Sequence, residues 1–261
     1  MKLGLIGCGK MGSALLKGIM KSDSRIEALI FDSYAPSAEE LSTASSAAVA
    51  DNIDSLVSVC EVILLCVKPN DVSDAVTATA QWEGKLLLSI AAGVTTEALN
   101  DYSGGVAKII RVMPNTPALI GQGASAFCRG KSAKEADAKI AKDLLSCVGT
   151  VSEVKESLMD AVTGLSGSGP AYVYTIVEAL SDAGVKQGLP RDIALQLACQ
   201  TVKGATAMVQ ESGLHPSELR DQVTSPGGTT IAGLAALEEK GLRHALISAV
   251  DAATKRSQEL G

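Results

Sequence analysis

The amino-acid sequence predicts an α/β domain with a doubly wound parallel sheet, followed by an all-α domain. Short aliphatic runs alternate with helical periodicity through the first part of the 261-residue chain. These runs are apolar almost throughout, as in strands that helices cover on both faces of a sheet. After about residue 157 the strand signal vanishes, and prolines and glycines mark the ends of successive helices. We therefore expect one domain at residues 1–157 and a second, helical domain at residues 158–261.

Strands and helices are expected to alternate from the start of the first domain. The expected strands are Lys2–Ile6, Ile26–Phe31, Ala47–Ala50, Glu61–Val67, Lys85–Ala91 and Ala107–Val112. The expected helices are Met11–Met20, Pro36–Ser46, Asp71–Thr79 and Thr95–Asp101. Gly121–Cys128 and Thr150–Val154 flank a helix at Lys134–Cys147 and are expected to extend the sheet.

In the second domain, prolines open helices and glycines end them. The helices are expected to start near Pro170, Pro190, Pro216, Gly228 and Gly241. The first should end near Gly184 or Gly188, and the second at Gly213. Their apolar arcs are wider than one small bundle can cover, which predicts a homo-oligomer, at least a dimer.

Composition excludes several classes of protein. A net charge of −6 and a pI near 5.1 leave no basic surface for nucleic acid. The longest apolar runs, Val62–Val67 and Leu86–Val94, are too short to span a bilayer. Glycines and lysines interrupt the apolar first twenty residues, and no cleavage site follows, so we expect a soluble, cytoplasmic protein. Six cysteines without a C-x-x-C pair, and two histidines without a cysteine at ligand spacing, predict neither disulfides nor a metal site.

A glycine-rich turn follows the first expected strand directly and opens the first expected helix. Ile6 ends the strand, and Gly7-Cys8-Gly9-Lys10-Met11-Gly12 has the pattern G-x-G-x-x-G. In this context the first glycine allows the tight turn, the second the approach of a pyrophosphate, and the third the packing of helix on strand. The anion would lie at the positive end of the helix. The sequence therefore predicts a dinucleotide site, whereas the hexapeptide alone would indicate only a turn.

The end of the second expected strand bears on the choice of dinucleotide. Asp32 lies 20 residues after Gly12, where an acid can accept a hydrogen bond from the ribose 2′-OH and would repel a 2′-phosphate. This favours NADH slightly, but Ser33, Tyr34 and Ser37 offer hydroxyl groups to a phosphate. Asp32 has an alternative role as a cap of the turn before Pro36. NADPH and NADH both stay open as the cofactor.

Three further loops follow expected strands, at the edge where open α/β sheets bind ligands. They are Cys66–Pro69, Ser89–Gly93 and Met113–Pro117. Lys68, in the first of them, is either a proton donor or an anchor of its loop, and the second role is the commoner one.

The second domain contains one segment that suits a small anion. Within Val223–Ile231, a Ser-Pro-Gly-Gly turn leads into a helix, and such a turn can direct consecutive backbone N–H groups at one point. A helix start capped by threonine would explain Thr229 or Thr230, but not the proline and two glycines before them. We therefore expect a carboxylate site here. A second glycine-rich loop, Gly164–Pro170, is either packed beside the cofactor or a hinge.

These motifs resemble those of the pyrroline-5-carboxylate reductases over essentially the whole chain. The matching blocks are GLIGCGKMG at residues 4–12, VKP at 67–69, SIAAGV at 89–94, MPNTP at 113–117, AVTGLSGSGPAYV at 161–173, GLPR at 188–191, HP at 215–216 and SPGGTTI at 225–231. TGLSGSGPAY and SPGGTTI are highly specific. The resemblance implies a Rossmann-like domain followed by an all-α dimerisation domain, and reduction of 1-pyrroline-5-carboxylate to L-proline by NADPH or NADH.

The resemblance also implies roles for individual residues. Substrate binding falls to Ser225, Gly227, Gly228, Thr229 and Thr230, with Thr230 near the ring nitrogen as the catalytic residue. Cofactor binding falls to Ile6, Gly7, Cys8, Gly9, Lys10, Met11, Gly12, Asp32, Asn52, Val67, Lys68, Pro69, Ala91, Ala92 and Asn115. In the family the helices of two subunits interlock, so we expect the substrate loop of one subunit to complete its neighbour's site.

Two alternative functions share the first glycine turn. A β-hydroxyacid dehydrogenase would need a lysine base a few residues into the helix after Gly164–Pro170, and Ala171–Thr175 contains none. A non-catalytic nucleotide sensor would have no use for Ser225–Thr230. An imino acid reductase, in contrast, works largely by orienting its two reactants, which agrees with the lack of a His, Cys or metal cluster.

Overall fold

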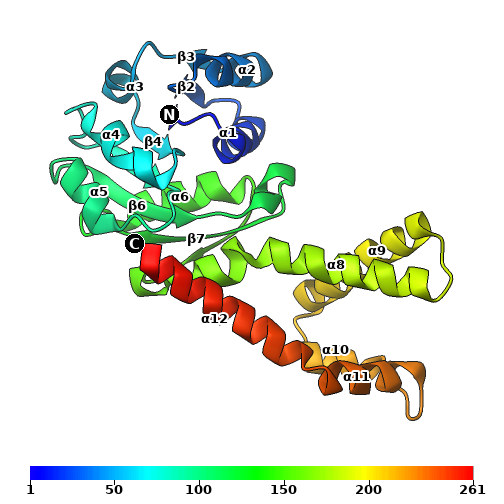
Figure 1. Ribbon diagram of the computed structural model, residues 1–261. Coiled ribbons are helices and arrows are strands. Elements are labelled where there is room, and N and C mark those ends of the chain that lie inside the picture. The colour runs from blue at the N-terminus through cyan, green and yellow to red at the C-terminus, as the bar shows by residue number, and fades with distance from the viewer. Residues whose placement is uncertain (261) are drawn as a thin grey trace. The chain divides into compact units, whose positions relative to one another are not determined.

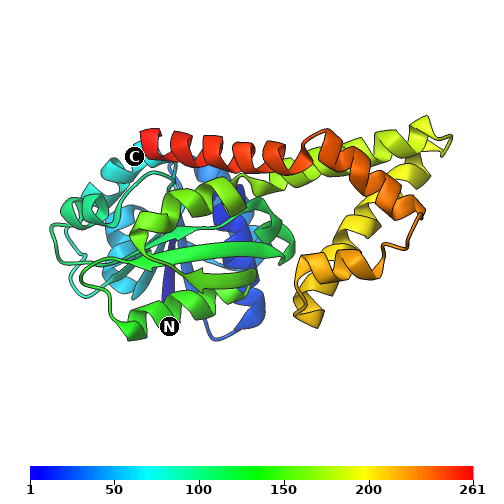
Figure 2. The ribbon, with the colours of Figure 1, turned by 90° about the horizontal axis from the view of Figure 1, so that it is seen from below.

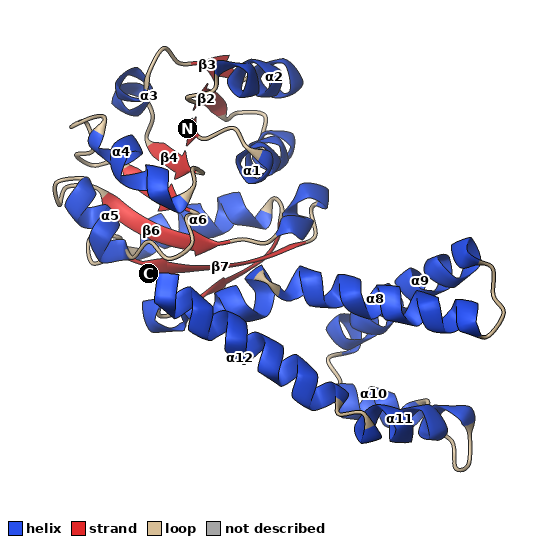
Figure 3. Cartoon of the chain, viewed as in Figure 1, coloured by secondary structure: helices blue, strands red, loops and turns tan. Residues whose placement is uncertain are grey.

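The computed structural model describes residues 1–260, and the chain divides into two compact units (Figure 1). The first unit contains Met1–Ser168 together with the chain from Asp251 onward, and the second contains Gly169–Val250. Within the described residues, every strand belongs to the first unit and the elements of the second are all helices (Figure 3). The predicted order, α/β followed by all-α, is confirmed. The boundary expected between residues 157 and 158 stays a prediction.

One eight-stranded sheet forms the centre of the first unit, in the order β3-β2-β1-β4-β5-β6-β7-β8. The strands are β1 Lys2–Ile6, β2 Glu27–Phe31, β3 Ala48–Val49, β4 Val62–Leu65, β5 Leu86–Ser89, β6 Lys108–Met113, β7 Gly123–Arg129 and β8 Gly149–Glu153. β1 to β6 are parallel, whereas β7 is antiparallel to β6 and β8 is parallel to β7. The strand order reverses between β1 and β4, so the crevice at their carboxyl ends is where such a sheet binds its ligand.

Helices cover both faces of this sheet. They are α1 Lys10–Ser22, α2 Ala35–Ser45, α3 Ile53–Val59, α4 Val72–Thr77, α5 Thr96–Tyr102, α6 Glu135–Ser146 and α7 Met159–Val162. Short 3₁₀ turns lie at η1 Pro69–Asp71, η2 Thr116–Ile120 and η3 Glu156–Leu158, and a π-helical turn, η4, lies at Thr163–Gly167. β4 and β5 are buried at every residue and β1 at all but its first, so these central strands are apolar almost throughout.

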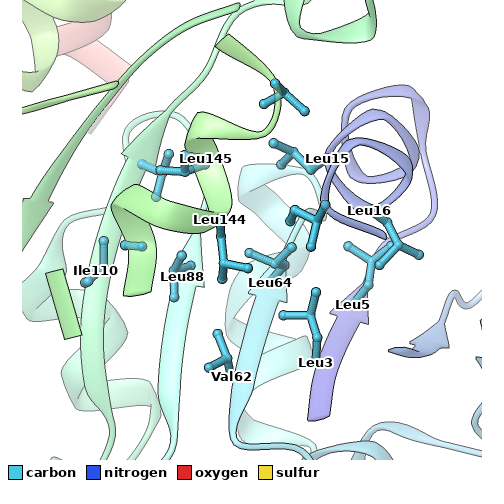
Figure 4. Packing of buried hydrophobic residues seen from close by; sticks show 14 of the residues in the cluster. Leu3, Leu5, Leu15, Leu16, Val62, Leu64, Leu88, Ile110, Leu144 and Leu145 are labelled. Carbon is cyan, nitrogen blue, oxygen red and sulfur yellow. The ribbon is translucent and has the colours of Figure 1, made fainter. Parts of the chain in front are cut away.

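Alternate residues of each strand supply two separate cores. On one face Leu3, Leu5 and Leu64 pack with Leu15 and Leu16 of α1 and with α6 (Figure 4). On the other face the neighbouring strand residues, Ile6, Ile63 and Leu65 among them, pack with α3, α4 and α5. A fully buried leucine or isoleucine contributes about 1.5–3 kcal/mol through its burial. The first unit therefore holds a complete hydrophobic core within one chain.

The sequence analysis did not predict α3, which fills the stretch between β3 and β4. Asn52 caps this helix: its side-chain oxygen accepts a hydrogen bond from the Ser55 amide at 2.8 Å, and the Ser55 hydroxyl accepts one from the Asn52 amide at 3.3 Å. This reciprocal pair is a capping box with serine in place of the usual acid or amide. The capping residues are present in the sequence, but the helix is too short to show a clear hydrophobic periodicity.

Five helices make up the rest of the described chain, from residue 169 to residue 260. They are α8 Gly169–Lys186, α9 Arg191–Ser212, α10 Pro216–Gln222, α11 Thr229–Glu239 and α12 Leu242–Leu260. α9 ends at Gly213 in the left-handed conformation, as predicted. α12 is one unbroken helix (Figure 2) whose last turns belong to the first unit, where the Ser257 hydroxyl donates to the Asp160 carboxylate at 2.7 Å.

The second unit has almost no interior of its own. Among residues 169–250 only Ser181, Ala194 and Ala198 are buried. The apolar side chains of Tyr174, Leu197 and Met208 are between 53% and 63% exposed, and others on the same helices are 41% to 46% exposed. An apolar surface of this extent marks a protein–protein interface. No helix within residues 1–260 combines the length and the apolar character that crossing a bilayer requires.

Candidate active site

The first glycine of the G-x-G-x-x-G turn is held between two strands. Gly7 has φ +98°, and its amide donates to the Phe31 carbonyl of β2 at 2.9 Å. A Cβ at this position would lie 2.7 Å from the carbonyl carbon and oxygen of Cys66, which follows β4. Both the backbone conformation and the space therefore require glycine.

The other two glycines of the turn differ from each other in their surroundings. A Cβ on Gly12 would lie 2.2 Å from the Gly7 carbonyl oxygen, so Gly12 allows α1 to pack against the turn. A Cβ on Gly9 would meet no atom within 4 Å. The packing of the chain thus does not require glycine at position 9. The open space beside Gly9 is where a ligand can approach the backbone.

The start of α1 leaves its first amides available to an anion. Gly9 is the N-cap residue, and no side chain caps the helix. The first N–H groups of a helix have no intrahelical partner, and the helix dipole adds positive potential there. Uncapped amides beside an open glycine fit a diphosphate, so the residues present suit a dinucleotide cofactor.

Asp32 is bonded to the same turn. Its Oδ2 accepts a hydrogen bond from the Cys8 amide at 2.7 Å, and its Oδ1 accepts one from the Tyr34 amide at 2.8 Å. The alternative role expected for Asp32, as a turn cap, is thus present in the structure. Burial raises the pKa of the Cys8 thiol to about 12, and the negative charge of Asp32 adds to the shift.

A pocket of about 290 Å³ opens beside this turn. Its walls are Ile6, Gly7, Phe31, Asp32, Ser33, Ile53, Val67, Asp71, Asp74 and Ala75. Ile6, Gly7, Asp32 and Val67 are among the cofactor residues expected from the sequence. Ile53, Asp71 and Asp74 were missed, because they lie on α3 and around the start of α4 and belong to no motif. The pocket lies where the carboxyl ends of β1, β2 and β4 meet.

The remaining cofactor residues follow the neighbouring parallel strands. Lys68 and Pro69 follow β4 and are exposed, while Ala91 after β5 is buried and Ala92 is exposed. Asn52 precedes α3 as its cap. The carboxyl ends of parallel strands meet at one edge of a sheet, so the topology places these residues along the edge that carries the glycine turn. Their contacts with a cofactor stay a prediction.

Asn115 is buried, and internal hydrogen bonds engage both ends of its side-chain amide. Its Nδ2 donates to the Ser166 carbonyl at 3.0 Å, and its Oδ1 accepts from the Ala124 amide at 2.8 Å. These bonds tie the loop after β6 to β7 and to the π-helical turn η4. Asn115 therefore fixes the backbone of its loop, a role that the sequence did not suggest.

The second candidate site is the turn that opens α11. The Gly228 amide donates to the Ser225 carbonyl at 3.1 Å, and Gly227 has φ +66°. Proline at the second position and a positive-φ glycine at the third are typical of a type II turn. A Cβ on Gly228 would lie 2.4 Å from the Ser225 hydroxyl oxygen. Both glycines are thus required by the turn itself.

Threonine does not cap α11. Gly228 is the N-cap residue, and no side chain bonds to the first amides of the helix. Within residues 1–260 the hydroxyls of Ser225, Thr229 and Thr230 likewise make no internal hydrogen bond. Uncapped amides and three hydroxyls without an internal partner therefore lie at one helix start, as an anion site would require. The role of each residue toward a substrate stays a prediction.

Comparison with known proteins gives the family. Residues 156–260 match the family model described as pyrroline-5-carboxylate reductase dimerisation, and residues 2–93 match the one described as NADP oxidoreductase, coenzyme F420-dependent. A pyrroline-5-carboxylate reductase of Pisum sativum is 45% identical, with 99% of this chain and 95% of the relative covered. The chain belongs to the pyrroline-5-carboxylate reductase family. A pyrroline-5-carboxylate reductase of Methanosarcina acetivorans is 44% identical, with 100% of this chain and 98% of the relative covered.

Solved pyrroline-5-carboxylate reductases have the same fold. The Plasmodium falciparum structure, which has NADP bound, superposes with a TM-score of 0.88 at 35% identity over 100% of this chain and 98% of that one. The Coxiella burnetii structure superposes with a TM-score of 0.93 at 30% identity, over 99% of this chain and 98% of that one. The chain is an NAD(P)H-dependent oxidoreductase that reduces pyrroline-5-carboxylate to proline, as predicted. The comparisons favour this function over the hydroxyacid dehydrogenase and the nucleotide sensor.

Proposed function

We propose that the two glycine turns divide the reduction of 1-pyrroline-5-carboxylate between them. The turn at Gly7–Gly12 binds the diphosphate of the cofactor, and the turn at Ser225–Thr230 binds the carboxylate of the imino acid. The observation that carries this proposal is that both turns open helices whose first amides no side chain caps. Each is thus an anion site with its partner supplied from outside the chain.

At the cofactor end, the chain contributes binding and orientation. The amides at the start of α1 hold the diphosphate, and the pocket at Ile53 and Ala75 receives the adenosine. Val67, Lys68, Pro69, Ala91 and Ala92 line the path toward the reacting ring. When bound, the reduced nicotinamide supplies a hydride.

At the substrate end, the amides and hydroxyls around Gly228 and Thr229 hold the carboxylate. Each charge-assisted hydrogen bond contributes about 1.5–3 kcal/mol, so two or three of them bind a small acid firmly. The Thr230 hydroxyl lies at the start of the same helix and positions the ring nitrogen. A carboxylate fixed on one side and a nitrogen fixed on the other leave the C=N carbon in a single orientation.

The reaction needs little further acid–base chemistry. A protonated imine is the better electrophile, and it accepts a hydride at carbon to give the secondary amine of proline. Thr230 does not ionise near neutrality, so it orients and polarises the nitrogen without titrating. Most of the rate enhancement then comes from holding the two reactants in a reactive orientation, which lowers the activation barrier by up to about 7–11 kcal/mol in favourable cases.

The enzyme is proposed to act as a homodimer or higher homo-oligomer formed through residues 158–261. The wide exposed apolar surface of the second unit supports this, because a second copy of the chain would bury it. We also propose a cytoplasmic location, which the six free cysteines of the chain would suit.

The test is the loss of nicotinamide absorbance on addition of 1-pyrroline-5-carboxylate. Wild type should turn over, and Thr230→Ala should lower kcat by about 10- to 100-fold, because one oriented donor is worth a few kcal/mol in a transition state. Thr230→Ser should recover most of the rate, since serine keeps the hydroxyl.

Thr43→Ala is the matched control. Thr43 is an exposed threonine of α2, in the first unit and outside the apolar surface of the second, and its replacement should leave kcat and KM unchanged. No imino-acid-dependent oxidation by wild type would refute the function. Unaltered turnover in Thr230→Ala would refute only the role of Thr230.

A further inference from the structure

The adenosine end of the cofactor pocket is lined by acidic side chains. Asp32, Asp71 and Asp74 are three of its ten lining residues, and none of the ten is lysine or arginine. Asp32 comes from the end of β2, whereas the other two come from η1 and α4. The three carboxylates thus reach one cavity from two separate segments of the chain.

Asp32 is fixed in this position. Its two oxygens accept hydrogen bonds from the amides of Cys8 and Tyr34, at 2.7 and 2.8 Å. A rotation of the side chain away from the pocket would break both bonds and leave two turn amides without partners. A carboxylate has about four acceptor sites, so Asp32 can still accept a hydrogen bond from a ligand hydroxyl.

No cation neutralises the other two acids. Within residues 1–260, neither Asp71 nor Asp74 forms an ion pair or a side-chain hydrogen bond. Lys10, within the glycine turn, and Lys68, after β4, are exposed and lie outside the pocket lining. The pocket lining therefore carries three acidic side chains and no basic one.

Dinucleotide cofactors of the two kinds differ at this end alone. NADH presents a ribose 2′-OH, which donates a hydrogen bond to a carboxylate, whereas NADPH presents a 2′-phosphate. A phosphate monoester carries a charge of about −1.5 to −2 at neutral pH. Repulsion between such a group and a fixed carboxylate about 4 Å away is large at the effective dielectric of a protein surface.

We propose that this enzyme prefers NADH, and that Asp32, Asp71 and Asp74 determine the preference. The proposal rests on the proposed function, since it places the cofactor in the pocket beside the glycine turn. The Plasmodium falciparum relative, which is 35% identical to this chain, has NADP bound. This chain would therefore differ from that relative in cofactor use while keeping the same reaction.

The test compares kcat/KM for NADH and NADPH at saturating imino acid and low ionic strength. Wild type should favour NADH by at least about tenfold, equivalent to about 1.4 kcal/mol. The ratio should fall as salt is added, because screening weakens repulsion between partly exposed charges. Calorimetric binding of NAD⁺ and NADP⁺ should give the same order without relying on turnover.

Two sets of variants locate the effect. Asp32→Ser should raise the use of NADPH the most, but it also removes two bonds of the turn. The double variant Asp71→Asn, Asp74→Asn removes two charges without removing any internal bond, and it should narrow the NADH to NADPH ratio by about two- to fivefold. Glu83→Gln is the charge-matched control: Glu83 is exposed and precedes β5 at the opposite edge of the sheet, so the ratio should not change.

Each outcome decides the matter. Turnover with both cofactors and a preference for NADPH would overturn the proposal and leave the function intact. A preference for NADH that stays unchanged both in the double variant Asp71→Asn, Asp74→Asn and in Asp32→Ser would also overturn the proposal. No turnover with either cofactor would instead count against the proposed function itself.

Discussion

The two glycine turns look alike in sequence but differ in how far one chain completes them. The turn at Gly7–Gly12 is enclosed: backbone atoms of Gly7 and Cys66 lie within 3 Å of where added Cβ atoms would sit, and Asp32 bonds to the Cys8 amide. The turn at Ser225–Thr230 has no such enclosure. A Cβ on Gly227 would meet nothing within 4 Å, and the atoms nearest to one on Gly228 belong to Ser225 of the same turn. The α11 helix that follows buries no residue.

This contrast follows from the units that carry the turns. α1 buries Gly12, Leu15, Leu16 and Ile19 against a sheet that belongs to the same chain. α11 is apolar on most of its surface, and its partner is missing from a single chain. We therefore expect the cofactor turn to bind its ligand within one subunit and the substrate turn to need a second subunit around it.

The largest effect is expected from Gly12→Ala. A Cβ 2.2 Å from the Gly7 carbonyl oxygen forces α1 away from β1, so the free energy of unfolding should fall by about 3–5 kcal/mol. Urea unfolding followed by circular dichroism measures this fall.

Gly9→Ala is the matched control in the same turn. Its Cβ enters open space, so the free energy of unfolding should stay within about 0.5–1 kcal/mol of wild type. The affinity for the cofactor should nevertheless drop by about tenfold or more, because the methyl group keeps the diphosphate from the backbone. Equal stability losses in both variants would show that the open space beside Gly9 does not exist.

A smaller effect is expected from the buried thiol of Cys8. Its pKa is raised from 9.0 to about 12 in the folded chain, so the folded state keeps a proton that the unfolded state releases. Cys8 therefore stabilises the fold fully below pH 9, and this contribution is lost as the pH rises toward 12. Unfolding free energies at pH 8 and pH 10.5 should decline less in Cys8→Ala than in wild type.

Cys199 supplies the comparison in the second unit. It is exposed, so Cys199→Ala removes a thiol without disturbing a buried site and is the control for the loss of a cysteine. A wild-type decline no steeper than that of Cys8→Ala would mean that the turn is not buried as described.

Much of the fold was predictable because local signals and tertiary packing agree. The apolar runs of β1, β4, β5 and β6 and the proline and glycine boundaries of α8, α9 and α10 all match the sequence expectations. The sequence missed α3 and the helical turns at Met159–Gly167, which are too short for a hydrophobic period. The opposite direction of β7 and β8 was also not foreseen, since strand direction follows from connections and not from composition.

The candidate sites were predictable where backbone geometry demands particular residues. Gly7, Gly12, Gly227 and Gly228 are required by positive φ or by close approach, and a sequence records such requirements directly. Asp71 and Asp74 could not be found in this way, because only the fold brings them to the pocket. The two internal bonds of Asn115 are likewise a product of tertiary structure.

The dependence of the substrate turn on a second subunit can be tested with a monomeric variant. Leu197→Asp combined with Met208→Asp places charges on the exposed apolar face of α9, away from both turns. Sedimentation would establish the monomer, and cofactor affinity and imino acid reduction would then be measured on it. The account predicts cofactor binding like that of wild type with reduction lost. Reduction at the wild-type rate by a folded monomer would contradict it.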